Sequence, residues 1–326
     1  MPERVVDFST NANVLPWRGW ETLTALSLPQ LLSAYPDDEA EELRAIVAGL
    51  ESCPIENVLA VNGSNEAVFL LASFFAGKKA AVLQPAYGEY LRALLAHGAD
   101  VSGVTTLEHL PEDAEAFFLC NPCNPTGAYI EGGTLEGLFA RRPYTLFVVD
   151  EAYINFLTGE RWKIDFLRYD NVVLLRSLTK IFHLCGARVG YVLAGGKWVG
   201  RLKSRQPTWS VNALAQAAAA AFLRDEDFVR ETRAFYAAET PRFIAEVERA
   251  GFTVVPTRTN FFLINVSRLG DGEVIRALLE RGLSVRHTRN FPGLGGRYIR
   301  VATRLPGEND LLVRALLQGF SPGNFA

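Results

Sequence analysis

The amino-acid sequence lacks the features that mark several large classes of protein. Four cysteines in 326 residues are too few and too scattered for the disulfide framework of a small secreted domain. A formal net charge of −3 argues against a general nucleic-acid binder, which normally carries a basic excess. No apolar run approaches the length of a membrane span, and the first residues lack the apolar core of a secretory signal. We therefore expect a cytoplasmic protein that binds neither nucleic acid nor membrane.

Cys120 and Cys123 form a C-x-x-C pair, which some proteins use to bind zinc or to carry out redox chemistry. No second Cys/His pair follows at the spacing of metal ligands. The pair also lies where an apolar run gives way to Asn-Pro-Thr-Gly, which is typical of a strand end followed by a turn. We therefore expect two buried or half-buried free thiols and no metal site.

The remaining composition is that of a soluble globular protein. Hydrophobic residues make up 49% and charged residues 21%, and the length allows two lobes. Short apolar runs alternate with longer amphipathic ones, which predicts an α/β fold with a mostly parallel sheet. Some runs are continuously apolar, as expected for strands buried on both faces: 80–83, 116–120, 144–150, 171–176 and 189–194. Helices are predicted over 38–50, 65–76, 88–97, 134–140 and 211–223.

The pattern changes after a long amphipathic helix predicted from about residue 225 to 250, which Gly251 should end. Beyond it, short strands and helices alternate: strands 252–256, 261–266, 284–288 and 298–303, and helices 272–281 and 308–319. The sequence therefore predicts a large domain of residues 35–224. A smaller α+β domain is predicted to be formed by both termini, residues 1–34 and 225–326.

Lys180 is the most informative single residue because of what accompanies it. It follows an apolar strand, an earlier strand ends at Asp150, and Arg188 lies eight residues further on. Two segments upstream, 62–66 and 121–127, are suited to binding a phosphate. The combination meets the needs of pyridoxal phosphate, which requires an amine for its aldehyde, a carboxylate for its pyridinium and donors for its phosphate.

The phosphate would lie at the start of a helix. Gly63 allows close approach of the backbone, and Ser64 can cap the helix that follows, so that amide donors face an anion. The same Asn-Gly-Ser pattern is also common in ordinary turns before helices. Ser177 and Arg188, on either side of Lys180, could add a hydroxyl and a guanidinium to the same phosphate.

Other side chains are suited to the cofactor ring. Asp150 should lie at the carboxyl edge of the sheet, where α/β proteins bind ligands, and a protonated pyridine nitrogen would partner it. Tyr87 could stack on the ring, and Asn124 and Tyr153 could donate hydrogen bonds to its phenolic oxygen. The structural alternatives are a helix cap or salt bridge for Asp150, and core packing for each aromatic residue.

The C-terminal region is rich in arginine. Arg286 and Arg300 lie within apolar strands, where an unpaired charge would be costly, so a doubly anionic substrate is the natural expectation. A solvated strand face would account better for Arg289, Arg297 and Arg304.

At these residues the chain resembles the pyridoxal-phosphate enzymes of fold type I, the aspartate aminotransferase superfamily. The resemblance covers nearly the whole chain in the family's order: Tyr35–Asp37, Asn62–Glu66, Asn121–Gly127, Asp150–Tyr153, Ser177–Lys180, Arg188 and Arg300. Within the superfamily it is most similar to the branch of histidinol-phosphate aminotransferases and threonine-phosphate decarboxylases.

The resemblance implies a role for each matching residue. Lys180 would bind the cofactor's aldehyde covalently, and Asp150 would pair with its pyridine nitrogen. Tyr35 would reach into the partner subunit's site of a homodimer. The remaining cofactor contacts would be Gly63, Ser64, Asn65, Tyr87, Asn124, Tyr153, Ser177, Thr179 and Arg188. The substrate contacts would be Asn11, Asn124, Arg286 and Arg300, and the catalytic residues Lys180, Asp150 and Tyr153.

Finer features favour the decarboxylases of cobalamin biosynthesis: Asp7–Asn13, Leu175–Lys180, Trp209–Ala215 and Asn290–Leu294. The resemblance thus implies decarboxylation of L-threonine O-3-phosphate to (R)-1-amino-2-propanol O-2-phosphate. One alternative is an aminotransferase of the histidinol-phosphate type. Another is a non-catalytic relative that retains the fold, which the presence of Lys180, Asp150 and Arg188 disfavours.

Overall fold

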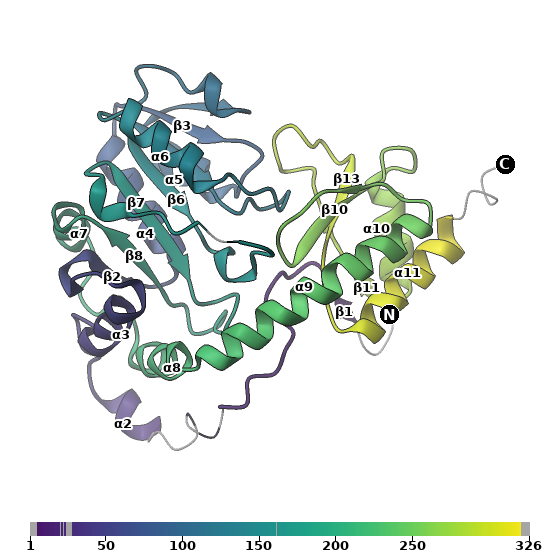
Figure 1. Ribbon diagram of the computed structural model, residues 1–326, viewed down its shortest axis with the longest axis horizontal. Helices are drawn as coiled ribbons and strands as arrows, with labels where there is room; N and C mark the ends of the chain where they lie inside the picture. Colours follow the sequence, from purple (N-terminus) through teal and green to yellow (C-terminus); the bar gives the residue numbers. More distant parts are fainter. Residues whose placement is uncertain (1–4, 20, 22, 24–27, 161, 321–326) are drawn as a thin grey trace.

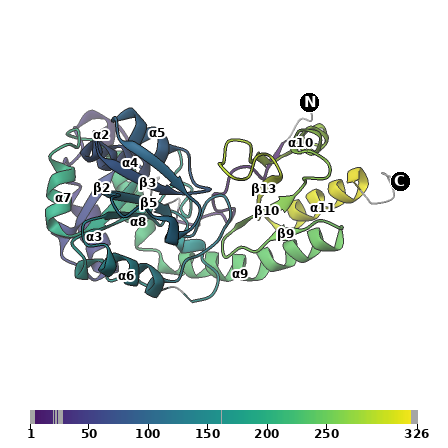
Figure 2. The same cartoon turned by 90° about the horizontal axis from the view of Figure 1, so that it is seen from above.

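Two lobes share one long helix. A computed structural model describes residues 5–19, 21, 23, 28–160 and 162–320. Helix α9 (Glu226–Arg249) begins at the larger lobe and runs along the smaller one (Figures 1 and 2). Phe228 and Tyr236 near its start belong to the larger hydrophobic core, whereas Phe243 and Val247 near its end belong to the smaller core. The helix therefore connects two separate cores.

The larger lobe contains a seven-stranded sheet in the order β2-β8-β7-β6-β5-β3-β4. All pairings among β7, β6, β5, β3 and β4 are parallel, and β8 is antiparallel to both of its neighbours. The predicted α/β fold with a mostly parallel sheet is confirmed. The strands are β2 (Val58–Val61), β3 (Lys79–Leu83), β4 (Asp100–Val104), β5 (Ala116–Cys120), β6 (Leu146–Asp150), β7 (Val172–Ser177) and β8 (Gly190–Ala194).

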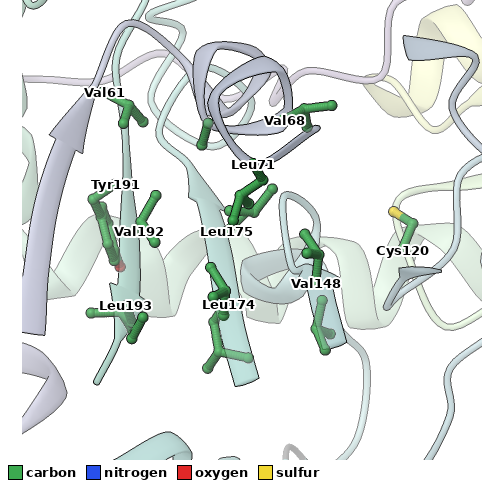
Figure 3. Close-up of a cluster of buried hydrophobic side chains, with 14 of the residues drawn as sticks. Val61, Val68, Leu71, Cys120, Val148, Leu174, Leu175, Tyr191, Val192 and Leu193 are labelled. Carbon is green, nitrogen blue, oxygen red and sulfur yellow. The ribbon is translucent and has the colours of Figure 1, made fainter. Parts of the chain in front are cut away.

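Helices cover this sheet, and its central strands β5, β6, β7 and β8 are buried along their whole length. Helix α4 packs against β7 and β8, and Figure 3 shows its Leu71 beside Leu175 of β7. The helices of the lobe are α2 (Leu28–Ser33), α3 (Glu41–Glu51), α4 (Ser64–Ala72), α5 (Glu89–Ala96), α6 (Gly132–Arg141), α7 (Gly196–Lys203) and α8 (Ala213–Leu223).

The smaller lobe has an antiparallel sheet in the order β12-β13-β10-β9 and a short parallel pair, β1 with β11. Its strands are β1 (Val6–Asp7), β9 (Val254–Val255), β10 (Phe261–Asn265), β11 (Leu283–Ser284), β12 (Arg286–His287) and β13 (Tyr298–Ala302). Helices α10 (Asp271–Glu280) and α11 (Pro306–Phe320) complete it. The predicted strand at 284–288 is thus two short strands.

Gly251 ends α9 as predicted. Its φ is +91°, in the left-handed region that glycine adopts at little cost. Gly251 N donates to Glu248 O at 2.9 Å, and Phe252 N donates to Val247 O at 3.3 Å. This pair of bonds satisfies carbonyls that the end of the helix would otherwise leave free.

The N-terminal segment contacts both lobes. Phe8 lies in the smaller core, whereas the indole ring of Trp17 stacks on Phe222 of the larger core with centroids 3.6 Å apart. The domain boundaries at 34/35 and 224/225 stay a prediction. Within the described part of the chain, no helix has both the length and the apolar character needed to cross a bilayer. The cytoplasmic location also stays a prediction.

Candidate active site

A cavity of about 340 Å³ lies beyond the carboxyl ends of β5, β6 and β7. Large-lobe residues line one side of it, while β12, β13 and the segment Ser9–Asn11 line the other. The carboxyl ends of parallel strands are the usual place for ligands in open α/β sheets. The fold therefore brings together residues from almost the whole length of the chain.

Most of the residues predicted from the sequence line this cavity. They are Asn11, Ser64, Asn65, Tyr87, Asn124, Asp150, Tyr153, Ser177, Thr179, Lys180, Arg188, Arg286 and Arg300. Gly63 does not line it but contacts Arg188, which does. Tyr35 lies at the surface, is 79% exposed and stacks on Trp209.

The start of α4 and Arg188 form a cradle for an anion. Gly63, with a φ of +71°, occupies the N-cap position, and a Cβ there would lie 2.7 Å from Arg188 Nη2. The prediction that Ser64 caps this helix is wrong, because Ser64 is its first residue and no side chain caps it. Instead, Ser64 lines the cavity at the first turn of the helix, the end at which backbone amides point towards an anion.

Arg188 adopts a left-handed backbone conformation with a φ of +62°, which a residue with a side chain rarely does. Its Nη1 donates to Cys185 O at 3.0 Å, and the described residues offer it no carboxylate within ion-pair distance. Nearby, the Ser177 and Thr179 hydroxyls share a hydrogen bond of 2.8 Å. This end of the cavity therefore has hydroxyl and guanidinium donors without a built-in anion.

Asp150 ends β6 and is 5% exposed. Its Oδ1 accepts from Ala152 N at 2.9 Å, and its Oδ2 accepts from the Tyr90 hydroxyl at 2.6 Å. Burial raises the pKa of Asp150 to about 6, although both hydrogen bonds lower it. Its neighbour Glu151 instead forms a buried ion pair with Arg176. Asp150 therefore remains available to a cationic ligand.

Lys180 is half-buried in the loop after β7, and its backbone carbonyl accepts a hydrogen bond of 2.8 Å from Asn13 N. In the described residues, its amine has neither a hydrogen-bond partner nor an ion-pair partner. Burial lowers the pKa of Lys180, and the nearby charges of Arg300 and Arg188 lower it further. An amine with a lowered pKa is neutral more of the time and therefore more nucleophilic.

Three further side chains, those of Tyr87, Tyr153 and Asn124, line the cavity. Tyr87 packs edge-on against Tyr90, with centroids 5.7 Å apart, and is 39% exposed. Tyr153 is buried edge-on against Phe261, and burial raises its pKa. Asn124 Oδ1 accepts a short hydrogen bond from Arg300 Nη1, so Asn124 links the lobes across the cavity.

Arg286 and Arg300 lie directly opposite each other on the antiparallel strands β12 and β13. Arg300 is 6% exposed and donates to Ser9 O at 2.7 Å as well as to Asn124. Among the described residues, Arg286 bonds to two neutral groups, His287 Nε2 at 3.3 Å and Asn290 Oδ1 at 3.2 Å. Like charges opposite each other destabilise a sheet, so this arrangement favours a bound anion.

The cavity fits pyridoxal phosphate. The cradle at Gly63 and Arg188 suits its phosphate, Asp150 suits its ring nitrogen, and Lys180 suits its aldehyde. Three buried polar atoms of cavity residues also have no hydrogen-bond partner among the described residues: Asn65 Oδ1, Asn11 Nδ2 and Arg300 Nε. Buried polar groups are normally bonded, which indicates that a ligand completes this site.

Comparison with known proteins decides the family. Residues 5–316 match the family described as aminotransferase class I and II. The chain belongs to this family. Members of the family depend on pyridoxal phosphate, so the protein is a pyridoxal-phosphate-dependent enzyme of fold type I, as the sequence predicted.

Relatives of two activities are similar to the chain. The threonine-phosphate decarboxylase of Salmonella typhimurium is 32% identical, over 99% of this chain and 94% of that protein. The histidinol-phosphate aminotransferase of Halalkalibacterium halodurans is 28% identical, over 96% and 89% of the two chains. Among solved structures, the L-threonine-O-3-phosphate decarboxylase from Porphyromonas gingivalis superposes with a TM-score of 0.89 and 26% identity, over 96% and 99% of the two chains.

The structure adds cavity residues that sequence reasoning missed: Ser9, Thr10, Tyr90, Cys120, Ala152 and Phe291. Tyr90 lies in the first turn of α5 and its ring packs against that of Tyr87, which precedes the helix, so no local spacing in the sequence signalled it. Cys120 is buried and Cys123 half-buried, and both are free thiols as predicted. Their sulfurs lie 3.1 and 3.2 Å from the carbonyl oxygens of Pro122 and Pro85.

Proposed function

We propose that the enzyme decarboxylates L-threonine O-3-phosphate to (R)-1-amino-2-propanol O-2-phosphate, a reaction of cobalamin biosynthesis in the cytoplasm. The observation that carries this proposal is the opposition of Arg286 and Arg300, neither of which is hydrogen-bonded to a carboxylate in the part of the chain that the structure describes. A substrate with both a phosphate and a carboxylate would balance the two charges, since guanidinium groups bind both anions in a bidentate way.

The energetics of the small-lobe strands support two anions rather than one. Burial lowers the pKa of Arg300 and the nearby charge of Arg286 lowers it further, whereas Tyr153 and Asp7 raise it. A bound anion would offset the cost of burying this guanidinium. Elsewhere in the lobe, Arg289 bonds Asp271 at 2.8 Å and Arg304 bonds Glu308 at 3.0 Å. Carboxylates are therefore available in this lobe, yet within the described part of the chain none of them forms an ion pair with either cavity arginine.

Each residue has a definable task in the reaction. Bound pyridoxal phosphate supplies an electron sink for the bond cleaved at the substrate's Cα. Lys180, with its lowered pKa, would bind the aldehyde and later deliver a proton to Cα. Asp150 would stabilise positive charge at the ring nitrogen. Arg286 and Arg300 would orient the substrate so that its Cα–carboxylate bond is the one that breaks, releasing CO2.

An aminotransferase of the histidinol-phosphate type is the second candidate. Its support is the 28% identity to the Halalkalibacterium halodurans enzyme of that name. The same Lys180 and Asp150 would serve it, with loss of the Cα proton in place of CO2. Histidinol phosphate carries a phosphate and no carboxylate, so one arginine would suffice for its anion, and Arg300, fixed by Asn124 and Ser9, is the better placed of the two. An acceptor such as 2-oxoglutarate has two carboxylates and would use both arginines.

We also propose a homodimer in which Tyr35 reaches the partner's cavity. Tyr35 is 79% exposed, and its ring lies 4.4 Å from that of Trp209, centroid to centroid. The neighbouring α2 has no buried residues, and its Leu28 and Leu32 are exposed. An obligate interface should bury well over ~2,000 Å². A stable, active monomer in light scattering would refute the dimer.

The decisive experiment compares two arginines of the same lobe. Arg286→Ala should lower kcat/KM for L-threonine O-3-phosphate more than for L-threonine, by about 2 kcal/mol, since it removes a charge-assisted contact to the phosphate. The matched control is Arg289→Ala, because Arg289 is bonded to Asp271 outside the cavity and should affect both substrates equally. Equal losses on both substrates in Arg286→Ala would place Arg286 outside the substrate site.

A further inference from the structure

The roles proposed above leave one strong contact of Asp150 without a function. The Tyr90 hydroxyl donates to Asp150 Oδ2 at 2.6 Å, and both side chains are buried. We propose that Tyr90 is a positioning residue that keeps Asp150 an ionised carboxylate, so that a carboxylate and not a neutral acid faces the ring nitrogen of the cofactor. The proposal rests on the role given to Asp150 in the proposed function, but it holds for decarboxylation and transamination alike.

The geometry around Asp150 supports such a role. Each carboxylate oxygen already has one fixed donor, Tyr90 on Oδ2 and the Ala152 amide on Oδ1 at 2.9 Å. A carboxylate has about four acceptor positions, so the two donors leave capacity for a ligand in the cavity that Asp150 lines. Tyr90 is held in the first turn of α5, 1% exposed, with its ring 6.2 Å from Phe118 between centroids.

The electrostatic environment of Asp150 shows why its carboxylate needs a hydrogen-bond donor. Burial is the main influence on Asp150 and raises its pKa to about 6, while the Tyr90 bond is the largest opposing one. Burial also raises the pKa of Tyr90, so its hydroxyl stays protonated and able to donate. The titratable groups that face Asp150 from the surrounding elements are Tyr87 and Tyr90 of the α5 region, Cys120 of β5, Glu151 and Tyr153 after β6, and Lys180 after β7.

Removing the Tyr90 hydroxyl should shift the proton shared by the ring nitrogen and Asp150 towards Asp150. Without Tyr90, Asp150 would lose a charge-assisted hydrogen bond and become a stronger base. It would then compete better for the proton shared with the ring nitrogen, and the ring would carry less positive charge. Lys180 also lowers the pKa of Asp150, but it lines the cavity where the cofactor would bind. We therefore do not expect Lys180 to take over the hydrogen bond that Tyr90 donates.

The test uses the full-length protein loaded with pyridoxal phosphate that carries ¹⁵N in its ring. In Tyr90→Phe, the aromatic ring that packs against Phe118 and Tyr87 remains, and only the hydroxyl is lost. The ¹⁵N chemical shift should move towards that of an unprotonated pyridine, and cofactor affinity should fall about 10-fold. Tyr169→Phe is the matched control, because Tyr169 packs on Phe139 away from the cavity.

A second substitution tests the direction of the effect. Replacing Tyr90 by 3-fluorotyrosine makes the phenol more acidic and its hydrogen bond stronger, so the ¹⁵N shift should move the opposite way from that in Tyr90→Phe. Asp150→Asn serves as the reference. If Asp150→Asn changes the ¹⁵N shift and Tyr90→Phe does not, the inference about Tyr90 alone is overturned. If neither changes it, the assignment of Asp150 to the ring nitrogen fails, and this inference fails with it.

Discussion

The two walls of the cavity differ in how their charges are balanced. On the large-lobe wall, the carboxylate of Asp150 lies with the cations Lys180 and Arg188. On the small-lobe wall, Arg286 and Arg300 are opposed on neighbouring strands, and their hydrogen-bond partners within residues 5–19, 21, 23, 28–160 and 162–320 are neutral groups. A wall with both negative and positive side chains suits a cofactor that carries charges of both signs. A wholly positive wall suits anions that arrive with the substrate.

This difference indicates that the large-lobe wall serves the reaction itself, whereas the small-lobe wall determines which substrate is bound. Substitutions in the large-lobe wall should impair every reaction of the enzyme, since both candidate activities use the same cofactor contacts. Substitutions in the small-lobe wall should change which substrate is used and leave cofactor affinity unchanged, and Arg286→Ala allows both to be measured.

Lys180→Ala should give the largest effect. Activity on every substrate should fall by about 10⁴-fold or more, since the proposed covalent attachment and the proton carrier are lost together. The fold should persist, because Lys180 is only half-buried and makes no side-chain hydrogen bond in the described structure.

Borohydride reduction of the wild-type enzyme, followed by peptide mapping, checks this assignment. The cofactor should be found on the peptide that contains Lys180. A reduced adduct on a different lysine would refute the assignment of Lys180 as the residue that binds the cofactor.

Asp150→Asn should have the next largest effect, because it removes the proposed partner of the ring nitrogen. We expect a loss of ~3–4 kcal/mol in transition-state stabilisation, similar to that for other preorganised charged or polar groups. The measurement is kcat/KM on any accepted substrate, together with the melting temperature as a check on the fold. Rates within a few-fold of the wild type would show that Asp150 is structural.

A smaller effect on cofactor affinity is expected when the pH is lowered. Burial raises the pKa of Asp150 to about 6. Below that pH the carboxylate becomes neutral and no longer attracts a protonated ring nitrogen, so cofactor affinity should fall as the pH is lowered. At about pH 5 the loss should be about 10-fold relative to neutral pH. The phosphate of the cofactor also titrates near this pH, so Asp150→Asn is the control: it should lose less affinity over the same range.

The large-lobe wall could be predicted from local sequence to a large extent. Strands β5, β6 and β7 are continuously apolar, and Asp150 and Ser177 come at the ends of two of them. Because parallel strands end at the same edge, these ends predict where the residues meet. Arg188 is close enough along the chain to Lys180 to be assigned with it.

Contacts between distant segments could not be predicted in the same way. Tyr90 and Asp150 are 60 residues apart, and Asn124 and Arg300 are 176 apart. The opposition of Arg286 and Arg300 depends on the register of β12 and β13, which no local pattern specifies. Ser64 was misassigned as a cap because the glycine before it, with its φ of +71°, was free to take that position.

The most direct test of the account is to supply L-threonine O-3-phosphate with and without 2-oxoglutarate and to measure CO2 and glutamate in the same reaction. The account predicts CO2 and aminopropanol phosphate in equal amounts, independent of 2-oxoglutarate, because the two arginines hold both anions of the substrate. Glutamate formation without CO2 release would contradict it and assign the enzyme to the aminotransferases.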